Sequence, residues 1–164
     1  MPKIYLSMGS NLDKEIHIPS GLLRLQQHFG PLTASGIYES EPVGYDGPLF
    51  HNLVVGLVCD LEPEAIASLL GAVETLEGRE RTPGKKSPHT LDIDLLLYGD
   101  AVFERGRLKI PRDDITRYAF VLEPLAELAP GEKHPVLGIS YAQLWADFDR
   151  TPLRQRRVGD IPQP

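Results

Sequence analysis

The sequence lacks several features that define large protein classes. It has one cysteine, Cys59, so an intrachain disulfide is excluded and a reducing, cytoplasmic compartment is expected. No apolar run approaches the ~20 residues of a membrane-spanning helix, and Met1 to Leu12 lack the apolar segment of a secretory signal. Lys and Arg number 17 against 23 Asp and Glu, giving a net charge of −6. This balance argues against a general nucleic-acid binder, which carries a basic surface.

The composition is typical of a folded domain. Hydrophobic residues make up 41% and charged residues 24% of the 164 positions, which is too apolar for intrinsic disorder. Because domains average roughly 150 residues, we expect a single domain over residues 1–150. Residues 151–164 are rich in Arg, Gln and Pro, and they are expected to form a poorly ordered C-terminal tail. Cys59 ends an apolar run and is expected to be buried as a small hydrophobic side chain.

Hydrophobic periodicity predicts alternating strands and helices. Strands are expected at residues 4–8, 37–40, 53–59, 91–98 and 107–110. Helices are expected at 19–29, with Pro19 in the first turn and Gly30 as the stop, and at 63–77, 121–128 and 141–148. The strand at 53–59 has no charged or amide side chain, which predicts burial on both faces. The order of elements predicts an α+β fold with a ferredoxin-like βαββαβ core and additional short C-terminal helices.

The strongest chemical signal is a pair of carboxylates in the predicted strand from Leu91 to Tyr98. Asp92 and Asp94 are two positions apart, so both project from one face, with Cα atoms about 6.5–7 Å apart. Such a pair repels itself and loses hydration inside an apolar strand, and bound Mg²⁺ would offset both costs. An exposed strand end balanced by neighbouring Arg or Lys would explain the same pair.

A cationic segment leads directly into these aspartates. It contains one acid, Glu80, among the basic residues Arg79, Arg81, Lys85, Lys86 and His89. Cations beside paired carboxylates favour phosphoryl transfer, in which they clamp phosphate groups. A solvated charged loop is the alternative interpretation. The spacing of glycines and lysines excludes a P-loop, and no dinucleotide-binding fingerprint is present.

Asn52 stands among apolar neighbours in the strand that follows Phe50. A buried amide needs hydrogen-bond partners, so Asn52 either reads the edge of a heterocycle or bonds the backbone. Phe50 and Phe120 could enclose a flat ring, although aromatic side chains are more often part of a core.

Several segments together resemble the 6-hydroxymethyl-7,8-dihydropterin pyrophosphokinase family. The resemblance covers about residues 4–130 and rests on the order of the segments more than on any one of them. They are Tyr5 to Leu12, Tyr38 to Gly44, Phe50 to Val55, Ser87 to Gly99 and Phe120 to Leu125.

The resemblance implies a ferredoxin-like enzyme that moves pyrophosphate from MgATP to the pterin hydroxymethyl group and releases AMP in folate biosynthesis. It implies that Asp92 and Asp94 bind two Mg²⁺ ions, that Asn52 bonds the pterin edge, and that Phe50, Phe120 and Val43 surround the ring. Nucleotide-binding roles fall on Glu74, Arg79, Arg81, His89, Arg107 and Arg112, and catalytic roles on Arg79, His89, Asp92 and Asp94. The expected partners are ATP and a reduced pterin, with no nucleic acid, no membrane and a monomeric protein.

The sequence departs from the family pattern at the nucleotide side. His89 stands where the family usually has Arg, Lys86 where it often has an aromatic residue, and Arg112 where it often has His. These departures leave two alternatives open: a divergent relative that binds pterin or nucleotide with little turnover, and a ferredoxin-like interaction module without catalysis. The module would leave the Asp92–Asp94 pair without a neutralising metal.

Overall fold

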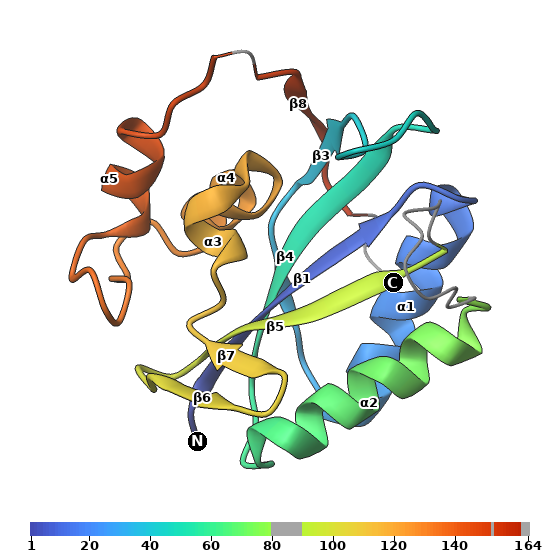
Figure 1. Ribbon diagram of the computed structural model, residues 1–164. Helices are drawn as coiled ribbons and strands as arrows, with labels where there is room; N and C mark the ends of the chain where they lie inside the picture. Colours follow the sequence, from blue (N-terminus) through green and yellow to red (C-terminus); the bar gives the residue numbers. More distant parts are fainter. Residues whose placement is uncertain (80–89, 152, 162–164) are drawn as a thin grey trace.

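The protein has a mixed α and β fold, in which helices cover both faces of one antiparallel sheet (Figure 1). The computed structural model describes residues 1–79, 90–151 and 153–161. The sheet order is β5-β1-β4-β3-β8. Its strands are β1 (Lys3–Ser10), β3 (Ile37–Ser40), β4 (Phe50–Val58), β5 (Asp92–Tyr98) and β8 (Gln155–Gly159), and β2 (Thr33–Ala34) also pairs with β4. The expectation of helices packed on a sheet is confirmed in this general form.

The remaining elements surround this sheet. The helices are α1 (Lys14–Phe29), α2 (Pro63–Leu76), α3 (Asp114–Arg117), α4 (Ala119–Leu128) and α5 (Tyr141–Ala146). A separate two-stranded hairpin comprises β6 (Phe103–Arg105) and β7 (Leu108–Ile110). Among the described residues, no helix combines the length and the apolar character needed to cross a bilayer.

The sheet separates two hydrophobic cores because successive side chains of a strand point to opposite faces. Leu53 and Val55 of β4 belong to the core that α1 and α2 cover, whereas Val54 between them packs with α4 and α5. Figure 1 shows α1 and α2 on one side of the sheet and α3, α4 and α5 on the other. The predicted burial of both faces of this strand is therefore confirmed.

Strand register gathers polar residues at one end of the sheet. Gly9 of β1 lies opposite Asn52 of β4 on one side and opposite Asp92 of β5 on the other. Three strands therefore place the buried amide and the carboxylate pair on either side of a residue that has no side chain.

Two local expectations were wrong at helix α1 and at Cys59. The helix begins at Lys14, after Asp13 with φ of 52°, so Pro19 lies inside the helix and not in its first turn. Its stop at Gly30 is confirmed, and the φ of 81° there is a left-handed conformation that favours glycine. Cys59 is half-buried and packs at the margin of a core, because β4 ends one residue before it.

The expectation of a poorly ordered tail was wrong for residues 155–159. They form β8, which pairs antiparallel with β3 and places Gln155 opposite Ser40. The strand is held by its backbone pairing with β3 and by hydrogen bonds from Gln155 and Arg157 to α4. Strands β2, β6 and β8 and helix α3 were not predicted.

Candidate active site

A pocket of about 320 Å³ lies at the end of the sheet that carries Gly9. It joins side chains from β1, the β3–β4 segment, β5 and the chain that leads into α4. The predicted site residues on its wall are Val43, Phe50, Asn52, Asp92, Asp94, Arg112 and Phe120. Residues far apart in the sequence therefore meet in one cavity, as the family resemblance implied.

The carboxylate pair occupies one wall of this pocket. Asp92 and Asp94 are both partly exposed, while Ile93 between them is buried, as expected for two side chains on one face of β5. The pKa of Asp94 is raised to about 7, chiefly by burial and then by the neighbouring Asp92 carboxylate, while Arg112 acts to lower it. A ligand that brings positive charge to this wall would therefore stabilise the ionised form of Asp94.

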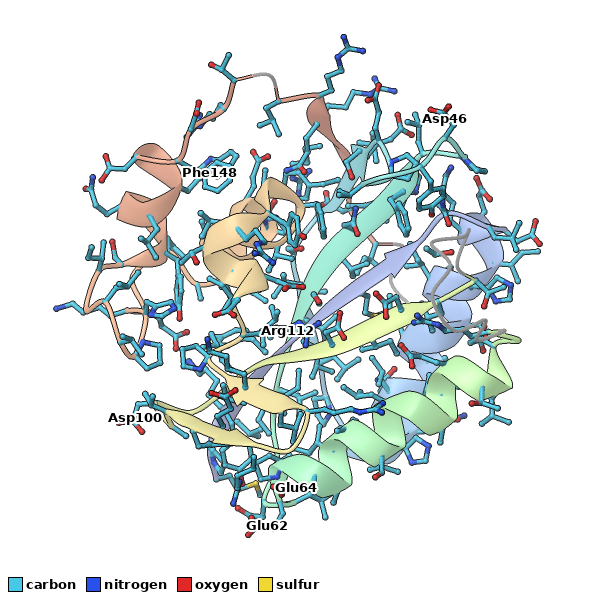
Figure 2. All side chains as sticks on the ribbon, in the orientation of Figure 1. Asp46, Glu62, Glu64, Asp100, Arg112 and Phe148 are labelled. Atoms are coloured by element: carbon cyan, nitrogen blue, oxygen red, sulfur yellow. The ribbon has the colours of Figure 1, made fainter. Side chains whose placement is uncertain are left out.

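Arg112 approaches the pair from the segment before α3. Its Nη2 lies 3.6 Å from Asp94 Oδ1, and its Nε donates a hydrogen bond of 3.1 Å to Asp114 Oδ2. Figure 2 shows Arg112 between α3–α4 and β5. A guanidinium held by a neighbouring carboxylate retains further donors for a phosphate group.

Arg79 reaches the pair from the other side, after the end of α2. Its Nη1 donates to Asp92 Oδ1 at 2.6 Å and to Glu74 Oε2 at 3.0 Å. Glu74 is 5% exposed and also accepts the backbone N–H of Ile93 at 2.8 Å. Glu74 thus holds the start of β5 through the Ile93 N–H, and it does not line the pocket.

The buried amide forms the opposite wall. Asn52 is 7% exposed, and its Nδ2 donates a hydrogen bond of 3.0 Å to Ser40 Oγ. A Cβ atom on Gly9 would lie 2.7 Å from Asn52 Oδ1, so only glycine leaves room for this side-chain position. The sequence alone left open a hydrogen bond from Asn52 to the backbone, whereas in the structure its amide donates to the side-chain hydroxyl of Ser40.

Aromatic rings complete this wall. Phe50 and Phe120 both line the pocket, from β4 and from the first turn of α4. The Tyr118 ring stacks on Phe120 with centroids 4.8 Å apart and planes at 18°. Val43 lies in the β3–β4 segment and is about half exposed. The cavity therefore offers flat apolar surfaces beside a fixed amide, which suits a planar heterocycle.

Of the predicted nucleotide-side residues that the structure describes, Arg112 lines this pocket, whereas Glu74, Arg79 and Arg107 do not. Arg107 is exposed in the turn between β6 and β7 and does not line the pocket. Arg81 and His89 lie outside the described residues, as does Lys86. The sequence reasoning missed Ser40 and Asp114 as site residues. Asp114 could have been found from the sequence, because two acidic residues directly follow Arg112 and could pair with its guanidinium.

The described side chains offer a divalent cation few protein ligands. Across residues 1–79, 90–151 and 153–161, no group of three or more His, Cys, Asp and Glu side chains is arranged to hold a metal ion. The Asp92–Asp94 pair does provide two carboxylates at the pocket wall. Mg²⁺ commonly takes one or two carboxylates and completes its shell with water and substrate phosphates. The residues present therefore fit Mg²⁺ that arrives with a phosphorylated ligand.

Comparison with known proteins gives consistent matches. Residues 5–130 match the family model of 7,8-dihydro-6-hydroxymethylpterin-pyrophosphokinase. The chain is 35% identical over 137 residues to the 2-amino-4-hydroxy-6-hydroxymethyldihydropteridine pyrophosphokinase of Pseudomonas aeruginosa, covering 81% of this chain and 84% of that protein. It is 34% identical over 128 residues to the protein of the same name from Bacillus subtilis, covering 76% of each.

Other relatives are longer than this chain. The Pneumocystis carinii folic acid synthesis protein fol1 is 31% identical over 156 residues, which cover 92% of this chain and 21% of that protein. The crystal structure of Plasmodium falciparum HPPK-DHPS with pteroate superposes with a TM-score of 0.72 at 15% identity, covering 88% of this chain and 42% of that one. At this identity the structural match shows the fold alone.

Proposed function

Because the chain belongs to the 7,8-dihydro-6-hydroxymethylpterin-pyrophosphokinase family, we propose that it transfers pyrophosphate from ATP to the hydroxymethyl group of 6-hydroxymethyl-7,8-dihydropterin, releasing AMP, in folate biosynthesis. The observation that carries this proposal is the composition of the pocket. One cavity joins a buried amide and aromatic rings to a carboxylate pair with an arginine.

In this proposal the amide side of the pocket binds the pterin. The Asn52 amide faces the donors and acceptors of the ring edge, and Ser40 holds that amide in its orientation. Phe50 and Phe120 enclose the ring faces, and Val43 closes the cavity from the β3–β4 segment. The second amide proton and the Oδ1 atom of this buried amide are suited to discrimination, because a ligand lacking the matching groups would leave them unpaired.

The carboxylate side binds the nucleotide. Asp92 and Asp94 hold Mg²⁺, for which two ions are predicted, and the bound metal would neutralise phosphate charge and withdraw electrons from the reacting phosphorus. Arg112 and Arg79 supply further positive charge, and Glu74 fixes Arg79 and the start of β5. Roles for Arg81, His89 and Arg107 remain predictions.

The reaction needs orientation more than a strong base. The pterin alcohol is a weak nucleophile, and the site must align its oxygen with the β-phosphorus of ATP. The two walls of the pocket are linked through the register of Gly9 with Asn52 and Asp92. This rigid connection sets the position of the ring edge relative to the phosphates.

The alternative of a noncatalytic interaction module is not favoured. It gives no reason for a pocket that collects Asp92, Asp94 and Arg112 around a common space. The relatives at 34–35% identity are also named as pyrophosphokinases. Further parts of the proposal are a ferredoxin-like core, a single catalytic domain over residues 1–150 to whose sheet β8 adds an edge strand, a monomeric state and a cytoplasmic location.

The proposal is tested by measuring AMP release with ATP, Mg²⁺ and the pterin, for the wild type and matched variants. Asp94→Asn is expected to abolish turnover that depends on Mg²⁺, whereas Asp100→Asn, an exposed position beyond the opposite end of β5 (Figure 2), is expected to retain it. Asn52→Ala is expected to raise the pterin KM far more than the ATP KM. Full activity of Asp94→Asn, or equal effects of Asn52→Ala on both substrates, would contradict the assignment.

A further inference from the structure

The C-terminal strand β8 contacts the same helix that carries Phe120. This strand lies outside the residues that match the family model, which end at position 130. It forms the edge of the sheet next to β3. Figure 1 shows the chain running from α5 around α4 to reach this edge.

One face of β8 is directed at α4. Gln155 Nε2 donates to the Ala119 carbonyl oxygen at 3.0 Å and to Glu123 Oε1 at 2.9 Å. Arg157 Nε donates to Glu127 Oε1 at 2.9 Å. Ala119, Glu123 and Glu127 are four residues apart in turn, so they form one stripe along the helix. Alternate residues of the strand therefore bind successive turns of one helix face.

The opposite face of β8 makes different contacts. Arg156 bonds Glu39 of β3, with an N–O distance of 3.2 Å. Arg154 lies 3.4 Å from Glu41, and both side chains are exposed. These pairs are at the surface, and exposed ion pairs contribute little to stability. The contacts with α4 are thus separable from those that attach the strand to β3.

Gln155 contacts both β3, which carries Ser40, and the start of α4, which carries Phe120. In the sheet it is opposite Ser40, whose hydroxyl accepts the hydrogen bond from Asn52. Through its side chain it holds Ala119, the residue immediately before Phe120. The Gln155 backbone therefore pairs with β3, whose Ser40 bonds Asn52, and the Gln155 side chain fixes the start of α4, which carries Phe120.

We propose that β8 is a clamp on α4 and that Gln155 is a positioning residue for the pterin, acting through Ala119 on Phe120. This inference rests on the proposed function. The clamp sets the distance between the aromatic ring of Phe120 and the amide of Asn52. Loss of the Gln155 contacts would release the first turn of α4 and leave the carboxylate pair on β5 unchanged.

The test compares Gln155→Met with Arg156→Met. Both remove a polar group from β8, but only the first faces α4. Gln155→Met is expected to raise the pterin KM about tenfold, the factor that corresponds to loss of about one to two hydrogen bonds, with the ATP KM changed less than about twofold. Arg156→Met is expected to leave both values near those of the wild type. Equal shifts of the two KM values, or no shift for Gln155→Met, would overturn the proposal.

Amide hydrogen exchange supplies a readout that does not need activity. In Gln155→Met, peptides spanning residues 118–125 are expected to exchange faster than in the wild type, while peptides of α2 are unchanged. Unchanged exchange at residues 118–125 would refute the clamp even if the enzyme is active. An inactive wild type would instead refute the proposed function, and the exchange result would still decide whether Gln155 holds α4.

A pair of substitutions that exchanges the charged and amide side chains tests the hydrogen bond between Gln155 and Glu123. Gln155→Glu places a carboxylate against Glu123 and the Ala119 carbonyl, so it is expected to weaken pterin binding more than Gln155→Met does. Adding Glu123→Gln to Gln155→Glu restores a donor and an acceptor between the two side chains. Partial recovery of the pterin KM is expected. A double variant as weak as Gln155→Glu alone would argue against a direct positioning contact.

Discussion

Glu127 offers the sharpest test of how the edge of the sheet is stabilised. Its carboxylate accepts hydrogen bonds from Gly36 N at 2.8 Å, from Tyr38 Oη at 2.5 Å and from Arg157 Nε at 2.9 Å. These contacts lower the pKa of Glu127 from the ordinary 4.5 to about 2, and the hydrogen bonds from Arg157 are the largest cause. Replacing Glu127 with Gln leaves one acceptor oxygen and removes the charge that these donors share.

The expected loss follows from the pKa. A decrease from 4.5 to about 2 corresponds to about 3 kcal/mol of preferential stabilisation of the carboxylate. The side chain is 31% exposed, and solvent screening reduces this to about 1–2 kcal/mol. Because the folded-state pKa is depressed, the contribution is complete above about pH 5, near the unfolded pKa. It is lost as the pH falls from there toward 2.

Urea unfolding followed by circular dichroism, at intervals from pH 7 to pH 3, measures this contribution. We expect Glu127→Gln to be less stable than the wild type by about 1–2 kcal/mol at neutral pH, and we expect the difference to shrink below about pH 4.5. Glu41→Gln is the matched control, since its exposed pair with Arg154 predicts a change under about 0.5 kcal/mol. A difference that is constant with pH, or equal to that of the control, would show that the Glu127 charge does not stabilise this edge of the sheet.

Three further changes have defined outcomes. Gly9→Ala is expected to displace the Asn52 amide, because its Cβ would lie 2.7 Å from Oδ1, and to raise the pterin KM in steady-state assays with little change for ATP. Arg79→Met removes a partner of the buried Glu74 and of Asp92, so a lower melting temperature and a higher ATP KM are expected together; an unchanged melting temperature would contradict the buried network. Ile66→Ala opens a cavity in the fully buried core between α2 and the sheet, and urea unfolding should show a loss of about 2–5 kcal/mol without altered KM values.

Local patterns in the sequence were sufficient for several structural features. Alternation in β5 placed Asp92 and Asp94 on one face, because the period of two is a property of any strand. The helical spacing that begins at Pro63 predicted α2, which ends at Leu76. The uninterrupted apolar run of β4 predicted burial on both faces, and both cores are present.

Other features depend on strand order and register, which the sequence pattern does not specify. The juxtaposition of Gly9 with Asn52 and Asp92 requires β1 to lie between β4 and β5. The tail looked unstructured because Gln155 and Arg157 are polar, and their partners in α4 are about 30 residues away in sequence. Glu74 was assigned to the nucleotide side only through the family resemblance, and its burial depends on contacts with the Ile93 backbone and Arg79 that helical spacing does not specify.

The proposed reaction is defined by which phosphorus of ATP is attacked, and phosphorus NMR of the complete reaction identifies that atom. The purified chain is incubated with ATP, Mg²⁺ and 6-hydroxymethyl-7,8-dihydropterin, and the products are resolved by their resonances. Transfer of pyrophosphate predicts AMP together with a pterin diphosphate in equal amounts. ADP with a pterin monophosphate would show γ-phosphoryl transfer and contradict the reaction assigned to this site.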